Sequence, residues 1–278
     1  MNTIELLGEE ETFKNIVERK ITEFEDNKID VIRDFAFYNY STLTSVSFPV
    51  ATSIGEKAFQ FCAGLTSVSF PVATSVGIYT FQGCSSLTSV SIPKATSIGE
   101  YAFNGCSKLT EVSIPEVTSI GQYAFESCSS LTKVSFLKAT SIGNYAFSGC
   151  SKLTSVSFPL ATSIGMEAFQ NCSSLTKVSF PKATSIGENA FDSCSSLTKV
   201  SFPVATSIGQ KAFQKCSGLT TIYVGTESDT VCTLSSTTAI PSSVTDIYVP
   251  KSLVDSYKTA TNWSYYADKI KADKEPVG

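Results

Sequence analysis

Cysteines are the chemically reactive residues with the most regular spacing in this chain. Eight of them recur every 22 residues. Such a series suggests a disulfide framework or a metal site. Equivalent residues of stacked repeats, however, have parallel side chains about 4.8 Å apart, whereas a disulfide needs converging Cβ atoms ~3.8 Å apart. Four zinc ligands must surround the ion, and thiols in a straight row cannot. The spacing therefore predicts buried, unbridged, metal-free thiols at Cys62, Cys84, Cys106, Cys128, Cys150, Cys172, Cys194 and Cys216.

The ninth cysteine, Cys232, lies outside this series, and we expect it to be the one exposed thiol. The chain has no histidine, so it lacks the commonest general base and metal ligand. Its many serines have only lysines as potential bases, at Lys133, Lys177 and Lys199. These lysines should be exposed and protonated. We predict no catalytic residue, no cofactor and no enzyme activity.

The 22-residue period extends to the apolar residues and defines the elements that position the cysteines. In Leu43–Phe48, the segment LTSVSF, valine and phenylalanine alternate with serine, which predicts a half-buried strand. ATSIG then turns a corner, and EKAFQFC predicts a single helical or 3₁₀ turn. One such coil cannot bury its own apolar face, and a period of this length is typical of a leucine-rich-repeat solenoid.

We therefore predict an α/β solenoid, a right-handed leucine-rich-repeat superhelix. It has parallel strands on one face, short helical or 3₁₀ turns on the other, and helical caps at both ends. The predicted segments are an N-terminal helical cap (1–20), nine 22-residue repeats (21–218), an irregular last repeat with a final strand (219–250), and a C-terminal helical cap with a tail (251–278).

Bulk composition excludes some partners. The net charge is −4, and residues 1–28 carry eight acids against four bases. No basic stripe appears, so we expect no nucleic-acid partner. No run of about 18 apolar residues exists, so we expect no membrane span, and the first residues do not resemble a secretory signal.

Positions that vary between repeats are where partner recognition would be encoded. Two residues before the repeating phenylalanine, four successive repeats carry tyrosine, a residue suited to protein or sugar contacts. Alternatively, these tyrosines only shield the phenylalanine column on the convex side. The three lysines are expected on the concave, strand-bearing face. The candidate partner-binding residues are Tyr79, Tyr101, Tyr123, Tyr145, Lys133, Lys177 and Lys199.

The repeat LTSVSFPVATSIGEKAFQFCAG resembles the BspA-like leucine-rich-repeat family from Ile21 to about Gly218. The resemblance implies a bacterial or protozoal surface protein that adheres to a protein or glycan partner without catalysis. The alternative is a structural spacer in a larger surface or phage-like assembly. A cell-surface or extracellular location rests on the resemblance alone, and the sequence predicts no oligomeric state.

Overall fold

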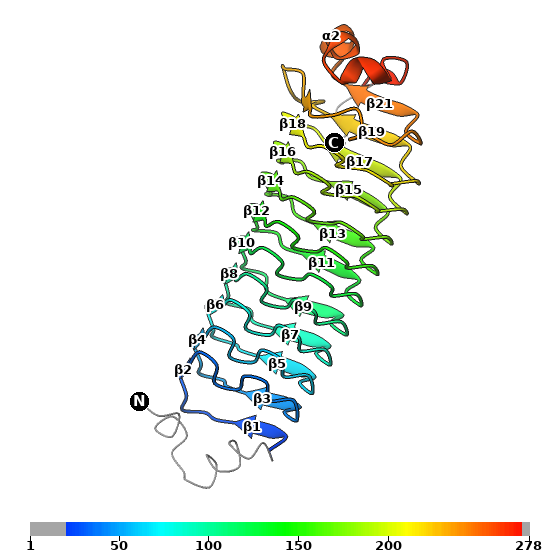
Figure 1. The fold of residues 1–278 in the computed structure, drawn as a ribbon. Coiled ribbons are helices and arrows are strands. Elements are labelled where there is room, and N and C mark those ends of the chain that lie inside the picture. The colour runs from blue at the N-terminus through cyan, green and yellow to red at the C-terminus, as the bar shows by residue number, and fades with distance from the viewer. Residues whose placement is uncertain (1–20, 274–278) are drawn as a thin grey trace.

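The computed structural model describes residues 21–273, and these form one continuous stack of coils (Figure 1). Each regular repeat contributes a long strand of three or four residues and a short strand of two. The expected strand is therefore present in every repeat, beginning one residue after the expected threonine, as at β3 (Ser45–Ser47). The second strand, as at β4 (Ser53–Ile54), was not expected. The chain is thus a parallel-strand solenoid of about 11 turns.

The long strands carry odd numbers and lie along one side of the stack in Figure 1. Their middle valine or isoleucine points inward in most strands, and the flanking residues point outward. They are β1 (Glu23–Glu25), β3, β5 (Ser67–Ser69), β7 (Ser89–Ser91), β9 (Glu111–Ser113), β11 (Lys133–Ser135), β13 (Ser155–Ser157), β15 (Lys177–Ser179), β17 (Lys199–Phe202), β19 (Thr221–Val224) and β21 (Asp246–Val249).

The short strands form the opposite side, where a buried Ile or Val follows an outward serine in most repeats. Eight of them, β6 to β20, pair in one parallel sheet, and β2 pairs with β4. They are β2 (Val31–Ile32), β4, β6 (Ser75–Val76), β8 (Ser97–Ile98), β10 (Ser119–Ile120), β12 (Ser141–Ile142), β14 (Ser163–Ile164), β16 (Ser185–Ile186), β18 (Ser207–Ile208) and β20 (Thr233–Leu234).

Equivalent residues lie opposite each other in the pairs, so Val68 faces Val90 and Ile120 faces Ile142. This register stacks each core column on itself. Phenylalanine rings such as Phe103 and Phe125 are fully buried, with centroids 5.1 Å apart. The period itself thus positions the core.

The segment between the short strand and the next repeat is not helical, and the expected helical or 3₁₀ turn is wrong. In residues 99–108, the N–H groups of Tyr101, Phe103 and Gly105 donate to carbonyls of the following repeat at 2.8–2.9 Å. Tyr101 and Gly105 have φ of 55° and 72°, in the left-handed region. These angles turn every second N–H toward the next coil, so the segment bonds along the stack and cannot continue as a helix.

The predicted α/β description with helical caps at both ends is also not supported. The N-terminal cap falls in residues 1–20, outside the described residues. At the other end the described chain has one α-helix, α2 (Val254–Thr259), between the 3₁₀ turns η2 (Lys251–Leu253) and η3 (Trp263–Tyr266). The last element within the described residues is a strand, β22 (Ile270–Ala272), which pairs with β21. The end of the solenoid is therefore covered by buried side chains of one short helix and one 3₁₀ turn, among them Tyr257 of α2 and Trp263 and Tyr266 of η3.

Candidate partner-binding surfaces

The eight regularly spaced cysteines form a buried column, as predicted. Each thiol donates to the carbonyl of a phenylalanine 25 residues earlier at 3.0–3.2 Å, as Cys106 does to Phe81. Burial raises the pKa of Cys62 to about 12. A thiol that stays protonated is a poor nucleophile, so this column fills the core.

Cys232 is not the exposed thiol that its irregular position suggested. It is fully buried, and burial raises its pKa to about 12. Its N–H donates to the Tyr257 hydroxyl at 2.9 Å, and the Trp263 indole N–H donates to its carbonyl at 2.6 Å. The C-terminal segment therefore covers the irregular repeat, a contact that the repeat pattern could not show.

The four candidate tyrosines form a continuous row, which we call the tyrosine ladder: Tyr79, Tyr101, Tyr123 and Tyr145. Their ring centroids are 4.8, 4.5 and 4.6 Å apart, and the rings are within 13° of parallel. All four side chains are partly exposed, in contrast to the buried phenylalanine column. The ladder lies on the segment after the short strands, which we call the turn face.

Charged groups close both ends of the tyrosine ladder. The Lys57 ammonium lies 5.2 Å from the Tyr79 ring centroid, and the Tyr145 hydroxyl donates to Glu167 at 3.1 Å. Partial burial, together with the Glu167 carboxylate, raises the pKa of Tyr145. Because the rings cover one another's faces, the ladder presents ring edges and phenol hydroxyls to a partner, and ring faces are not available for stacking.

A row of amide side chains accompanies the ladder. Gln82 donates to Asn104 at 3.1 Å, and Asn104 donates to Glu126 at 2.6 Å. Burial raises the pKa of Glu126, the hydrogen bond from Asn104 lowers it, and Glu167 raises it further. The C-terminal half of the ladder therefore has two carboxylates beside it.

At the N-terminal end of the turn face, three aromatic residues are exposed that sequence reasoning did not select. Phe35, Tyr38 and Phe61 are 51%, 44% and 42% exposed. Tyr38 lies 5.8 Å from Phe35 and 6.0 Å from Phe61 between ring centroids. The one sequence signal for this cluster is that aromatic residues stand at outward positions of the repeat.

The three candidate lysines lie on the opposite part of each coil. Lys133, Lys177 and Lys199 are the first residues of β11, β15 and β17, where side chains point outward. Lys177 and Lys199 are register partners on adjacent strands. The lysines therefore do not share a surface with the tyrosine ladder, and the predicted binding residues form two separate surfaces.

Sequence reasoning missed two tyrosines on this long-strand face. Tyr223 and Tyr248 replace the serine of other repeats, and their rings stack with centroids 4.7 Å apart. The Lys199 ammonium lies 4.3 Å from the Tyr223 ring centroid. Both tyrosines are visible in the sequence, because the segments IYV and IYVP stand where other repeats have VSF.

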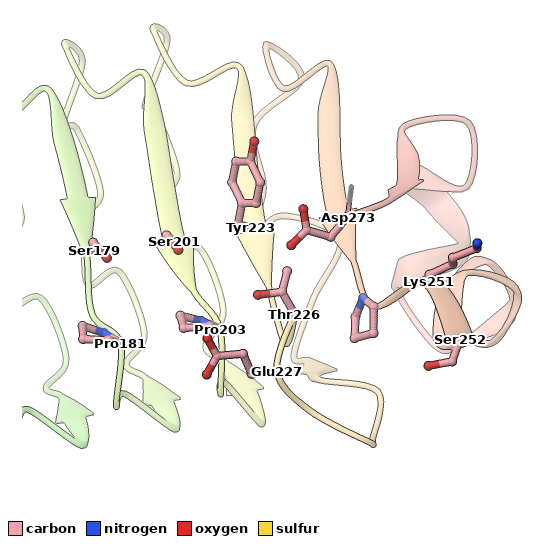
Figure 2. Close-up of a pocket in the computed structure, with 11 residues that line it drawn as sticks. Ser179, Pro181, Ser201, Pro203, Tyr223, Thr226, Glu227, Lys251, Ser252 and Asp273 are labelled. Carbon is pink, nitrogen blue, oxygen red and sulfur yellow. The ribbon is translucent and has the colours of Figure 1, made fainter. Parts of the chain in front are cut away.

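Lys177, Lys199 and Tyr223 line a shallow groove in two adjoining sections, of about 620 and 840 Å³, on the long-strand face. The sections share Ser179, Pro181, Ser201 and Tyr223. Figure 2 shows the serines and Tyr223 on successive strands, with Glu227 beside Pro203 and Asp273 toward the C-terminal end. Lys177 and Lys199 line the first section, which has no carboxylate in its lining, whereas Lys133 on β11 lies outside both linings.

Within residues 21–273, no three His, Cys, Asp or Glu side chains gather as a metal site would require. No helix in this part of the chain is long and apolar enough to cross a membrane. The surfaces available for chemistry are therefore the outward columns just described.

The sequence matches a known family of repeat proteins. The family model described as BspA type leucine-rich repeat region (6 copies) matches residues 8–132, 74–162 and 140–261. These matches together span most of the chain, and the chain belongs to this family. No curated protein sequence matches it significantly.

Solved leucine-rich-repeat proteins resemble the chain in fold. A T. pallidum leucine-rich repeat protein is 30% identical, with a TM-score of 0.52, over 55% of this chain and 77% of its own. A leucine-rich repeat protein from Bacteroides ovatus is 23% identical, with a TM-score of 0.40, over 92% of this chain and 85% of its own. A leucine rich cell surface protein from Faecalibacterium prausnitzii has the same identity and TM-score, with 92% and 80% covered.

Proposed function

We propose that the chain is a non-enzymatic binding protein that presents its repeat surface to a protein or glycan partner. The carrying observation is the tyrosine ladder. Every residue of its column, from Lys57 to Lys211, has φ of 53–58°, a region that favours glycine, yet no regular repeat places glycine there. The left-handed conformation costs roughly 1–2 kcal/mol for an L-residue. Side chains therefore occupy this column although glycine would adopt its backbone conformation more easily.

Stacking offsets part of that cost. A pair of stacked aromatic side chains contributes about 0.5–1.5 kcal/mol. The remaining property of the ladder is its outward edge, a row of four phenol hydroxyls between Lys57 and Glu167. Hydroxyls both donate and accept hydrogen bonds, and tyrosine is enriched at interfaces. A protein surface or a glycan matches such an edge.

We also propose a location at the bacterial cell surface, where the protein would act in adhesion. The support is membership of the BspA type family, whose resemblance implies this setting. A location test is direct: antibody labelling of intact producing cells should detect the chain without permeabilisation. Labelling only after lysis would contradict the surface location and leave the binding proposal unaffected.

The alternative function is a structural spacer within a larger assembly. The continuous short-strand sheet from β6 to β20 favours it, because paired strands in one register make a stiff rod whose length is fixed by the repeat number. A spacer needs no affinity of its own along its sides.

The experiment that separates the two functions is a combined glycan and protein array probed with the purified chain. We expect saturable binding to at least one glycan or protein. A matched probe carrying Tyr101→Ser and Tyr123→Ser reports whether the ladder contributes. Absence of binding to every glycan, matrix protein and intact cell would contradict the binding function and favour the spacer.

A further inference from the structure

The long-strand face carries a row of cations without counter-ions. Along the first position of successive strands the residues are Lys133, Ser155, Lys177 and Lys199. Within the described residues the ion pairs are Lys57–Glu56, Lys138–Glu116 and Lys271–Asp246, so these three lysines form none. Uncompensated charges of one sign along a groove attract a ligand of the opposite sign.

The groove also holds one of these lysines in place. The Lys199 ammonium lies over one face of Tyr223, whose ring stacks on Tyr248. A cation over the face of an aromatic ring is attracted by the ring's electron density. Lys199 is therefore directed along the face, next to Lys177, while the hydroxyls of Ser179 and Ser201 line the same groove.

The backbone of this face is not free to bind a peptide strand. The strands β15, β17, β19, β21 and β22 pair in one parallel sheet, so no strand edge opens into the groove between them. A peptide could not add itself as a further strand there. Recognition must use side chains, and the available groups are ammonium and hydroxyl groups that repeat at about 4.8 Å.

A repeating face suits a repeating ligand. A polymer with anionic groups and hydroxyls at regular intervals meets the same groups at several registers, which raises the effective concentration of each contact. We propose that the lysine row on β11, β15 and β17, together with the first section of the groove, binds an anionic polysaccharide, a sugar chain with carboxylate or sulfate groups. This ligand assignment rests on the proposed binding function but uses a different surface from the tyrosine ladder.

The test measures binding of the full chain to four probes at low salt: polygalacturonate, heparin, neutral dextran and poly-L-glutamate. The key variant carries Lys133→Ser, Lys177→Ser and Lys199→Ser. Serine already occupies this position in β3, β5, β7 and β13, so the variant should fold and melt as the parent does. The control variant carries Lys94→Ser, Lys108→Ser and Lys152→Ser, which removes three exposed lysines outside the groove.

We expect polygalacturonate or heparin to bind at least about tenfold more tightly than poly-L-glutamate or dextran, and more weakly as salt rises. The groove variant should lose about tenfold or more in affinity for that polysaccharide, and the control variant should stay within about twofold of the parent. Tyr223→Ser, which restores the serine found at Ser201, should weaken the same binding and serves as an independent variant.

Several results would overturn the assignment. They are no binding to either anionic polysaccharide, tighter binding to poly-L-glutamate, and equal losses in the groove and control variants. If the array finds a protein or neutral-glycan partner whose affinity survives the groove variant, the binding function stands and the anionic-polysaccharide assignment fails. If neither the array nor these probes give any binding, both fail.

Discussion

Two aromatic columns lie two residues apart on the same segment, and they share a pattern of backbone hydrogen bonds but differ in side-chain exposure. The phenylalanine column (Phe81, Phe103, Phe125 and its equivalents) is fully buried, with centroids 5.1–5.4 Å apart in these repeats. The tyrosine ladder is partly exposed, with centroids 4.5–4.8 Å apart. In both, the N–H donates to a carbonyl of the next repeat, as Tyr101 does to Gln122 and Phe103 to Ala124.

The comparison separates two roles. Because the backbone ladder is common to both columns, only the direction of the side chain decides whether a residue holds the fold or meets solvent. Inward columns tolerate little change, since each ring contacts the equivalent ring on either side. Outward columns accept tyrosine, lysine, glutamate and asparagine at the same φ. Positions that vary between repeats therefore belong to the solvent-facing surface. The predictions below test this division between inward columns that hold the fold and outward columns that meet solvent.

The largest expected effect concerns the inward cysteine column and alkaline pH. In the folded state burial raises the thiol pKa, to about 12 for Cys62 and Cys232, from an ordinary value of 9.0. Above pH 9 the unfolded chain releases thiol protons that the folded chain keeps, so this stability is fully present below pH 9 and is lost as pH rises toward 12. The thiols with a raised pKa are Cys62, Cys84, Cys106, Cys128, Cys150, Cys172, Cys194 and Cys232.

Each such thiol costs about 1.4 kcal/mol of unfolding free energy per pH unit above 9, so eight together reach on the order of 10 kcal/mol at pH 10. Melting temperature measured from pH 7 to 10.5 should fall steeply above pH 9. Replacing Cys62 and Cys232 together by alanine should make the slope shallower. A flat profile up to pH 10.5 would show that the column does not keep its protons.

The next effect breaks the inward aromatic column. Phe103→Ala should lower the free energy of unfolding by about 3–5 kcal/mol, because it removes a fully buried ring and leaves a cavity. Denaturant unfolding monitored by circular dichroism measures it. Tyr101→Ala in the same coil is the matched control, and an equal loss in the two variants would erase the distinction between the columns.

Two glycines in the same coil test whether close approach between coils or positive φ limits which residues this segment accepts. A Cβ on Gly99 would lie 2.7 Å from the Gly77 carbonyl carbon, an atom of a rigid neighbouring coil. Gly99→Ala should therefore cost about 3 kcal/mol by overpacking. Gly105 has φ of 72° but no atom within 3.8 Å of its added Cβ, and asparagine holds the equivalent position at Asn171.

Gly105→Asn should accordingly lower the free energy of unfolding by about 1 kcal/mol, because asparagine tolerates the left-handed region better than most L-residues but not as well as glycine. Thermal or denaturant unfolding of the two variants side by side gives the answer. A severe loss for Gly105→Asn together with a mild one for Gly99→Ala would mean that close approach between coils is not what limits this segment.

Much of this division could be predicted from sequence, because a fixed period forces each core column to stack on itself. The long strand, the burial of Phe103 and the burial of Cys106 all follow from it. The helical turn was a wrong prediction for a specific reason. Ala58, Phe59 and Cys62 have spacings that also suit one face of a helix, and only the positive φ at Lys57 and Phe61, which the sequence does not display, excludes a helix.

The remaining errors arise where the period ends or is too short to read. A two-residue strand such as Ser53–Ile54 shows no alternation, so it was read as a corner. Cys232 falls in the irregular repeat, and its burial depends on Trp263 and Tyr257, which approach from a segment with no repeat pattern. The stacked pair Tyr223 and Tyr248 is not predicted from the sequence. A single serine-to-tyrosine difference in each repeat shows no pattern until the strand register places the two residues opposite each other.

The central claim, that outward columns bind while inward columns hold the fold, is tested most directly by the double variant Tyr101→Ser and Tyr123→Ser. It removes three stacked pairs; at a partly exposed site each contributes about 0.5 kcal/mol, the lower end of the range for stacked rings, so the free energy of unfolding should fall by about 1.5 kcal/mol. The measurement is affinity for the partner found on the array, with thermal unfolding of the same sample. We predict at least about tenfold weaker binding with a small fall in melting temperature. A large fall in melting temperature with unaltered affinity would show that the ladder only supports the fold.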